Sequence, residues 1–188
     1  MANAVDAAVR ALKGGGIIVY PTDTLVGLGV RATDRRAVAR LRELKGRPGG
    51  MPISIAVSSL EELERWTRLT SERRRIIRRT LPGPYTVLVP ASVMARRKLA
   101  PDVLGPDASL GLRVPDHPVA REVARRAGPI TATSANRHGE PPSPTVAAAR
   151  KVFGRAIDAY VTLGPEPSGR PSMILDLRRD ELRTVERP

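Results

Sequence analysis

The sequence predicts an α/β domain in which helices flank a mostly buried, mixed β-sheet. Helix-like and strand-like patterns alternate along the 188 residues. Hydrophobic residues make up 41% of the chain but aromatic residues only 3%, so the core should be aliphatic. Several strand patterns follow one another late in the chain, which favours a mixed rather than a wholly parallel sheet. No Ser-rich or Pro-rich linker divides the chain, so we predict one domain over residues 1–188.

The first part of the chain predicts alternating helices and strands. Apolar residues recur at helical spacing over residues 5–12, and the glycines that follow end that helix. The run IIVY at 17–20 is typical of a short buried strand. Asp34 is placed to cap a second helix, which Gly46 ends. ISIAV at 53–57 predicts the next strand.

The rest of the chain continues the alternation. Ser59 and Glu62 form a capping box at the start of a helix through Leu63, and Pro118 suits the first turn of another helix. Further helices are expected at 71–80 and 145–153. Strands are expected at 86–90, 110–115, 129–134, 159–163, 172–177 and 182–185. Short polar loops follow several of these strands, and ligands of open α/β sheets bind beyond strand ends.

Composition argues against several kinds of site. The chain has no cysteine, and therefore no disulfide or thiolate metal site. Its histidines, His117 and His138, lack partners at metal-ligand spacing, so we expect no metal held by the protein. His117 precedes Pro118 and is interpreted as a helix cap. The chain has neither an apolar run of about 18 residues nor a signal-peptide pattern, which favours a cytoplasmic protein without membrane spans.

The net charge of +13 has two explanations, which stay open at this point. It indicates either simple solubility in an arginine-rich protein or an anionic partner such as a nucleotide or RNA. The densest basic run, SERRRIIRRT at 71–80, is interpreted as the solvated face of a helix. The scarcity of aromatic residues argues against a base-stacking RNA platform.

Glycine motifs for phosphate binding are weak in this sequence. It has no Walker A motif. GLGVRA at 27–32 fits the loose dinucleotide pattern, but it lacks a clear strand–turn–helix setting. Glycines that allow turns and close packing are the better interpretation of that run.

Cations and small polar residues are the better candidates for a site. Lys45 and Arg47 stand two apart on a flexible, Gly-rich loop, and Arg113 ends a strand. Ser134 and Asn136 are also two apart. Guanidinium groups bind carboxylates and phosphates through paired hydrogen bonds, while hydroxyl and amide groups both donate and accept. Together these residues predict a pocket for an anionic small molecule such as a nucleotide.

Five segments carry a resemblance to a known family. KGRP, LPGPYTVLVPA, GLRVPDHPVA, TSANRHGEPP and PSMILDL occur here in the order seen in the YrdC-like family of threonylcarbamoyl-AMP synthases and their relatives. The resemblance implies a twisted mixed sheet with helices around a deep basic cavity. It implies that ATP, bicarbonate and L-threonine react to give threonylcarbamoyl-AMP and pyrophosphate, with Mg²⁺ carried by ATP. The product would serve the N6-threonylcarbamoyladenosine (t6A) modification of tRNA. Possible partners are tRNA or double-stranded RNA and other proteins of that modification.

The resemblance also implies roles for individual residues. Lys45 and Arg47 would be the catalytic cations that face the ATP phosphates. The ATP-binding residues would be Lys45, Arg47, Ser109, Ser134, Asn136 and Arg187. The threonine-binding residues would be Thr24, Arg113 and Ser172, with Arg113 on the threonine carboxylate.

The sequence departs from the family pattern mainly on the threonine side. Asp23 stands where the family has Glu, and Val26 where it has Tyr. Met51 and Ala56 stand in place of the usual Asn and His, and Met173 changes the S-T-V/I motif. Two alternatives to a synthase therefore stay open. One is a non-catalytic nucleotide- or RNA-binding paralogue, and the other is a carbamoyl-transfer relative with a different acceptor.

Overall fold

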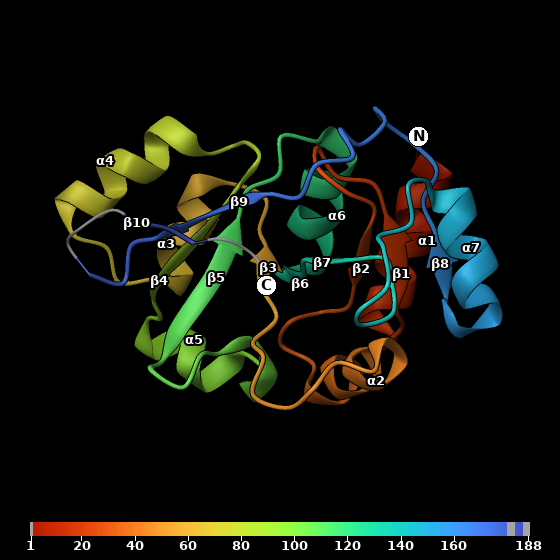
Figure 1. Ribbon diagram of the computed structural model, residues 1–188, viewed down its shortest axis with the longest axis horizontal. Helices are drawn as coiled ribbons and strands as arrows, with labels where there is room; N and C mark the ends of the chain where they lie inside the picture. The colour runs from red at the N-terminus through yellow and green to blue at the C-terminus, as the bar shows by residue number, and fades with distance from the viewer. Residues whose placement is uncertain (1, 180–182, 186–188) are drawn as a thin grey trace.

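The computed structural model describes residues 2–179 and 183–185, and in them the strands form two mixed sheets (Figure 1). The four-stranded sheet has the order β7-β2-β1-β8, with β1 (Ile18–Tyr20), β2 (Gly27–Gly29), β7 (Thr133–Ser134) and β8 (Ala159–Tyr160). The six-stranded sheet has the order β10-β9-β4-β5-β3-β6. Its strands are β3 (Ile55–Ala56), β4 (Tyr85–Pro90), β5 (Ser109–Arg113), β6 (Ile130–Thr131), β9 (Met173–Asp176) and β10 (Arg183–Val185). Each sheet has parallel and antiparallel pairs, so the predicted mixed α/β fold is confirmed, although two sheets form instead of one.

The helices begin and end where local sequence signals place them. They are α1 (Ala2–Lys13), α2 (Arg35–Lys45), α3 (Leu60–Trp66), α4 (Ser71–Thr80), α5 (Val93–Lys98), α6 (Pro118–Ala127) and α7 (Val146–Phe153). Asp34 caps α2 by accepting two backbone N–H bonds, and Gly46 ends it in the left-handed conformation with φ 63°. Ser59 caps α3 as predicted, but the carboxylate of Glu62 binds Ser58 rather than Ser59. The predicted capping box is therefore only half formed.

The two sheets meet at the segment expected to be one strand over 129–134. Its first part, β6, pairs with β3 in the six-stranded sheet, and its last part, β7, pairs with β2 in the four-stranded sheet. Ala132 lies between the two strands. The chain thus passes directly from one sheet to the other at a single residue.

Tyr20 explains the glycines of β2. Its ring is fully buried, and a Cβ atom on Gly29 would lie 2.9 Å from it and one on Gly27 3.2 Å from it. The Tyr20 hydroxyl donates to the carbonyl of Thr131 in the other sheet at 3.0 Å. The interpretation of GLGVRA as a close-packing sequence is therefore confirmed.

Side chains of β1 pack on both faces of its sheet. Val19 belongs to one apolar cluster, whereas Ile18 and Tyr20 belong to a second cluster with residues of α1 and α6. Ala56, fully buried, belongs to this second cluster as well. Among the described helices, none has both the length and the apolar character needed to cross a membrane.

A long connection joins the two sheets near their meeting point. Residues 161–172, here called the strap, lead from β8 in the four-stranded sheet to β9 in the six-stranded sheet. In Figure 1 this blue segment crosses the top of the molecule between the two sheets. The strap ends at Ser172, one of the predicted threonine-binding residues.

Candidate functional site

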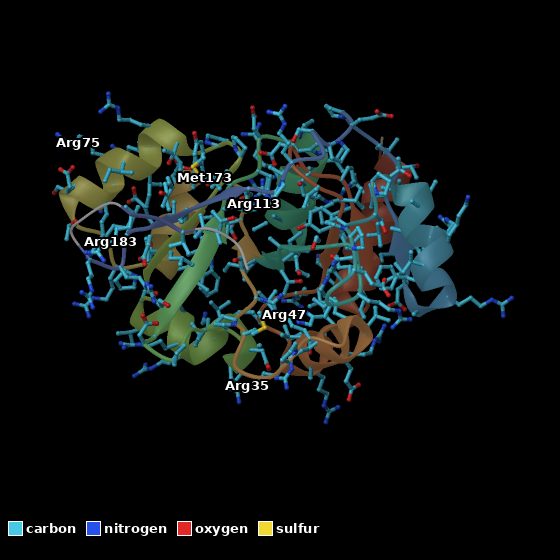
Figure 2. All side chains as sticks on the ribbon, in the orientation of Figure 1. Arg35, Arg47, Arg75, Arg113, Met173 and Arg183 are labelled. Atoms are coloured by element: carbon cyan, nitrogen blue, oxygen red, sulfur yellow. The ribbon has the colours of Figure 1, made fainter. Side chains whose placement is uncertain are left out.

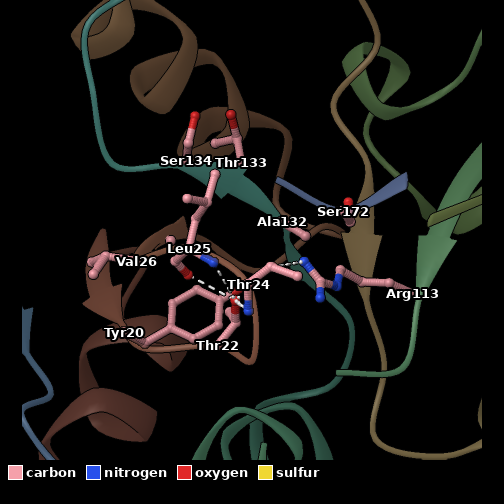
Figure 3. A pocket seen from close by; sticks show the side chains of 11 residues that line it. Tyr20, Thr22, Thr24, Leu25, Val26, Arg113, Ala132, Thr133, Ser134 and Ser172 are labelled. Carbon is pink, nitrogen blue, oxygen red and sulfur yellow. Dashed lines mark hydrogen bonds between the residues drawn. The ribbon is translucent and has the colours of Figure 1, made fainter. Parts of the chain in front are cut away.

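Arg113, the last residue of β5, points toward the loop that connects β1 to β2 (Figure 3). Its side chain is 8% exposed. One terminal nitrogen donates to Thr24 Oγ1 at 2.7 Å, and the other donates to a carboxylate oxygen of Asp23 at 2.6 Å. The guanidinium is therefore fixed by residues that directly follow β1.

Two buried atoms of this ion pair keep hydrogen-bonding capacity. Within the described part of the chain, Arg113 Nε and Asp23 Oδ2 have no hydrogen-bond partner. Burial lowers the pKa of Arg113, while the Asp23 carboxylate acts in the opposite direction. Because a guanidinium stays protonated in proteins and has five N–H groups, Arg113 can still donate hydrogen bonds to an anionic ligand, and Nε is its one nitrogen without a partner in the described residues.

A small cavity of about 30 Å³ lies beside Arg113. Its polar lining includes Thr22, Thr24, Arg113, Thr133, Ser134 and Ser172. The volume has room for about two water molecules. All three predicted threonine-binding residues line this cavity, together with one residue of the predicted ATP set. The structure thus brings together groups that are far apart in the sequence, as Figure 3 shows.

Lys45 occupies a different position from the one expected. It is the last residue of α2 rather than part of the loop, and it is only 3% exposed. Its ammonium group donates to the carbonyls of Ser134 and Asn136, both at 2.6 Å, and lies 3.3 Å from Asn136 Oδ1. Burial, with a smaller effect of Arg47, lowers the pKa of Lys45 to about 8. The prediction that Lys45 sits on a flexible loop was wrong, because α2 continues to Gly46.

Hydrogen bonds between its own polar groups stabilise the loop after β7. Ser134 Oγ donates to Asn136 Oδ1 at 2.5 Å, and the Asn136 amide donates to the carbonyls of Arg137 and Glu140. The backbone N–H of His138 donates to the carbonyl of Lys45 at 2.7 Å. Lys45, Ser134 and Asn136 therefore form one group connected by hydrogen bonds.

Arg47 is half-buried and bound to its own loop. Its guanidinium donates to the carbonyls of Met51 and Pro52 at 3.1 and 3.0 Å. Burial lowers the pKa of Arg47. Figure 2 places Arg47 and Arg113 toward the middle of the view, whereas Arg75 lies at its edge. Met51, which stands where the family has Asn, supplies a carbonyl to Arg47.

The remaining predicted residues lie elsewhere. Ser109 begins β5, so it is separated from Arg113 by about 13 Å along the strand. It is nearly buried, and its N–H bonds to Asp107. Arg187 lies outside the described residues. Neither prediction is tested by this geometry.

Residue-by-residue reasoning missed Thr22 and the pairing of Asp23. Thr22 is buried, and its hydroxyl oxygen accepts from the N–H groups of Thr24 and Leu25. It also lies 3.0 Å from Thr24 Oγ1. The signal was the polar sequence PTDT directly after a buried strand, which marks a turn stabilised by side chains.

Comparison with known proteins decides the family. A family model described as telomere recombination, Sua5_yciO_yrdC, matches residues 10–187. The chain is 38% identical to the threonylcarbamoyl-AMP synthase of Chromohalobacter salexigens over 185 residues, which cover 96% of each chain. The chain belongs to the Sua5/YciO/YrdC family. The family resemblance inferred from the sequence motifs is thereby confirmed.

Other members of the Sua5/YciO/YrdC family agree in sequence and fold. The threonylcarbamoyl-AMP synthase of Cellvibrio japonicus is 36% identical over 92% of this chain and 90% of its own. The crystal structure of P. abyssi Sua5 complexed with L-threonine superposes with a TM-score of 0.84 at 30% identity, over 92% of this chain. That match covers 50% of the P. abyssi protein, so the present chain spans about half its length. E. coli YciO gives a TM-score of 0.85 at 25% identity, over 96% of this chain and 87% of its own.

Proposed function

We propose that this chain is a threonylcarbamoyl-AMP synthase, which forms threonylcarbamoyl-AMP and pyrophosphate from ATP, bicarbonate and L-threonine. The observation that carries the proposal is its 38% identity, over 96% of both chains, to a protein of that name. The cavity beside Arg113 supports the proposal from the structural side. It combines a fixed cation with hydroxyl groups, which suits a small hydroxylated amino acid.

The threonine site would use groups that already face this cavity. The Arg113 guanidinium would donate to the threonine carboxylate, and the hydroxyls of Thr24 and Ser172 would bind its polar atoms. Ala56 is buried in the second apolar cluster, so a histidine at this position would displace core side chains.

The nucleotide site would use the group around Lys45. Its ammonium would exchange a carbonyl acceptor for a phosphate oxygen, and Arg47 would supply a second cation. Ser134 and Asn136 would hold the nucleotide through hydroxyl and amide groups. Ser109 and Arg187 stay part of this proposed set.

The proposed reaction needs no nucleophile from the protein. The amine of threonine combines with bicarbonate, which releases water and leaves a carbamate. A carbamate oxygen then bonds to the α-phosphorus of ATP as the bond to the bridging oxygen breaks and pyrophosphate leaves. Both reactants are anionic, so the residues contribute by positioning and by charge neutralisation.

Mg²⁺ is proposed to enter with ATP and to be coordinated mainly by phosphate oxygens, which are the hard ligands that it prefers. Within residues 2–179 and 183–185, no group of three or more His, Cys, Asp or Glu side chains is placed to hold a metal ion. The carboxylate of Asp23 is paired with Arg113. The chain's residues thus fit an ion that is carried by the nucleotide.

We further propose that the product serves t6A formation in tRNA in the cytoplasm, with other proteins of that modification as partners. The net charge of +13 is compatible with contact to tRNA or double-stranded RNA. Such contact should weaken as salt concentration rises, because it would be mainly electrostatic.

Pyrophosphate release tests the proposed function. Purified protein with ATP, Mg²⁺ and bicarbonate should release pyrophosphate only when L-threonine is present, and mass spectrometry should detect threonylcarbamoyl-AMP. Serine lacks one methyl group, so it should react more slowly by about 10- to 200-fold. Omitting bicarbonate should abolish release. ATP binding without pyrophosphate release under these conditions would contradict the synthase and favour a non-catalytic nucleotide-binding protein.

A further inference from the structure

His117 lies buried between α6 and the strap. It is 1% exposed, and its Nδ1 accepts the N–H of Ala120 at 3.3 Å, which caps α6. Its Nε2 lies 3.1 Å from the carbonyl of Pro165 in the strap. Because Nδ1 accepts, the proton of the neutral ring is on Nε2, which donates to Pro165. One imidazole therefore connects the start of a helix to the strap.

The strap backbone lies flat against this imidazole. Gly164 has a φ of 95°, and a Cβ atom at this position would lie 2.6 Å from His117 Cε1. A larger residue would be strained and would push the strap away from the ring. His117 therefore contacts the strap at two neighbouring residues, Gly164 and Pro165.

A few residues further on, the strap binds the loop that fixes Arg113. The N–H of Ser168 donates to the carbonyl of Asp23 at 3.2 Å, and the N–H of Gly169 donates to the carbonyl of Thr24 at 2.9 Å. The side chains of Asp23 and Thr24 are the ones that hold the Arg113 guanidinium. The strap therefore binds the backbone of the two residues whose side chains bind the cation.

These contacts form a closed ring. Arg113 and His117 both lie in the segment that leads from β5 to α6. From His117 the ring passes through the strap to Asp23 and Thr24, and from them back to Arg113. The strap then ends at Ser172, whose hydroxyl lies 2.8 Å from Thr86 Oγ1 and lines the cavity. Loss of one connection would loosen several walls of the cavity together.

We infer that His117 is a positioning residue for the cavity beside Arg113. It holds Pro165, and through the strap it keeps Asp23 and Thr24 against the guanidinium. The inference deepens the proposed function, on which its threonine readout rests. His117 itself touches no predicted substrate group.

The His117→Asn variant separates this role from helix capping. Asparagine is a good N-cap residue, so α6 keeps a side-chain acceptor, but the shorter side chain does not reach Pro165. Thr70→Asn makes the same kind of replacement at the exposed N-cap of α4 and serves as the matched control. Gly164→Ala disrupts the contact between His117 and the strap by a change in the strap itself, so it provides a second test if His117→Asn folds poorly.

The first measurement does not require activity. Hydrogen–deuterium exchange at the N–H groups of Ser168 and Gly169 should become faster in His117→Asn and in Gly164→Ala, and stay unchanged in Thr70→Asn. Mass-mapped labelling by phenylglyoxal should show that Arg113 becomes more reactive in the first two variants. Unchanged exchange and unchanged labelling in both variants would overturn the inference, whatever the chain's activity.

The second measurement uses the proposed reaction. KM for threonine should rise by about three- to tenfold in His117→Asn, the effect of losing one neutral hydrogen bond, while KM for ATP stays near the parent value. An equal rise in both constants, or no rise for threonine, would overturn the positioning role. A parent protein without pyrophosphate release would instead contradict the proposed function, and exchange and labelling would still decide the inference.

Discussion

The site contains three cations, Arg113, Lys45 and Arg47, whose charges are balanced in different ways. Arg113 is paired with the Asp23 carboxylate, so that region is neutral on balance. Lys45 donates to carbonyl and amide oxygens and Arg47 to carbonyls, and within the described residues neither cation has a carboxylate partner. A neutral pair with a spare N–H suits a zwitterion such as an amino acid, whereas uncompensated cations suit a polyphosphate. The region around Arg113 thus differs from the region around Lys45 and Arg47 in the groups that bind each cation, a carboxylate in the first and neutral oxygen acceptors in the second.

Breaking the neutral pair should have the largest effect. In Asp23→Asn the Arg113 charge stays buried without its carboxylate, which should lower the free energy of unfolding by about 3–5 kcal/mol. Urea denaturation measures the change. Glu122→Gln, which removes the carboxylate of an exposed pair with Arg125, is the control and should change stability little. Equal stabilities of Asp23→Asn and the parent would show that Asp23 does not balance Arg113.

Removing the uncompensated cation should mainly affect the nucleotide. Lys45→Met loses a charged hydrogen-bond donor worth about 1.5–3 kcal/mol, so ATP should bind roughly tenfold or more weakly. Calorimetry with ATP and Mg²⁺ gives the affinity. Lys98→Met, at the exposed end of α5, changes the same net charge and should leave affinity near the parent value. If both variants lose affinity equally, the effect is one of overall charge.

A pH titration should give the smallest effect and sharpen the comparison. The pKa of Lys45 lies at about 8, so its charged fraction falls as pH rises from 7 to 9. Phosphate binds the charged form, and ATP affinity should therefore fall over this interval, by no more than the loss in Lys45→Met. The variant itself should show a flatter profile. A parent profile as flat as that of the variant would exclude Lys45 from the phosphate contacts.

Much of the fold could be predicted from local signals. Asp34 and Gly46 mark the ends of α2 because capping depends on neighbouring residues. The division of residues 129–134 between two sheets was not predictable, because no turn residue interrupts the run. Which partner each half pairs with depends on strands far away in the sequence, β3 at about 75 positions for β6 and β2 at about 105 positions for β7.

The sequence predicted which residues to consider for the site, but not how they are arranged. Motif resemblance selected Thr24, Arg113 and Ser172, and the structure places all three at one cavity. The burial of Lys45 was not predicted, because it depends on carbonyl groups that lie about ninety positions later in the chain. Nor do motifs indicate that Asp23 pairs with Arg113, since a carboxylate in a polar loop has many possible partners.

The crossing of the chain at Ala132 has a mechanical consequence. Thr24 and Ser134 approach the cavity from the side of the four-stranded sheet, while Arg113 and Ser172 approach it from the six-stranded sheet. Any rotation of one sheet against the other about Ala132 would change the separation of these walls. The strap joins the same two sheets, so it would limit such a rotation. The two walls of the cavity are thus joined by a short connection at Ala132 and by a long connection through the strap.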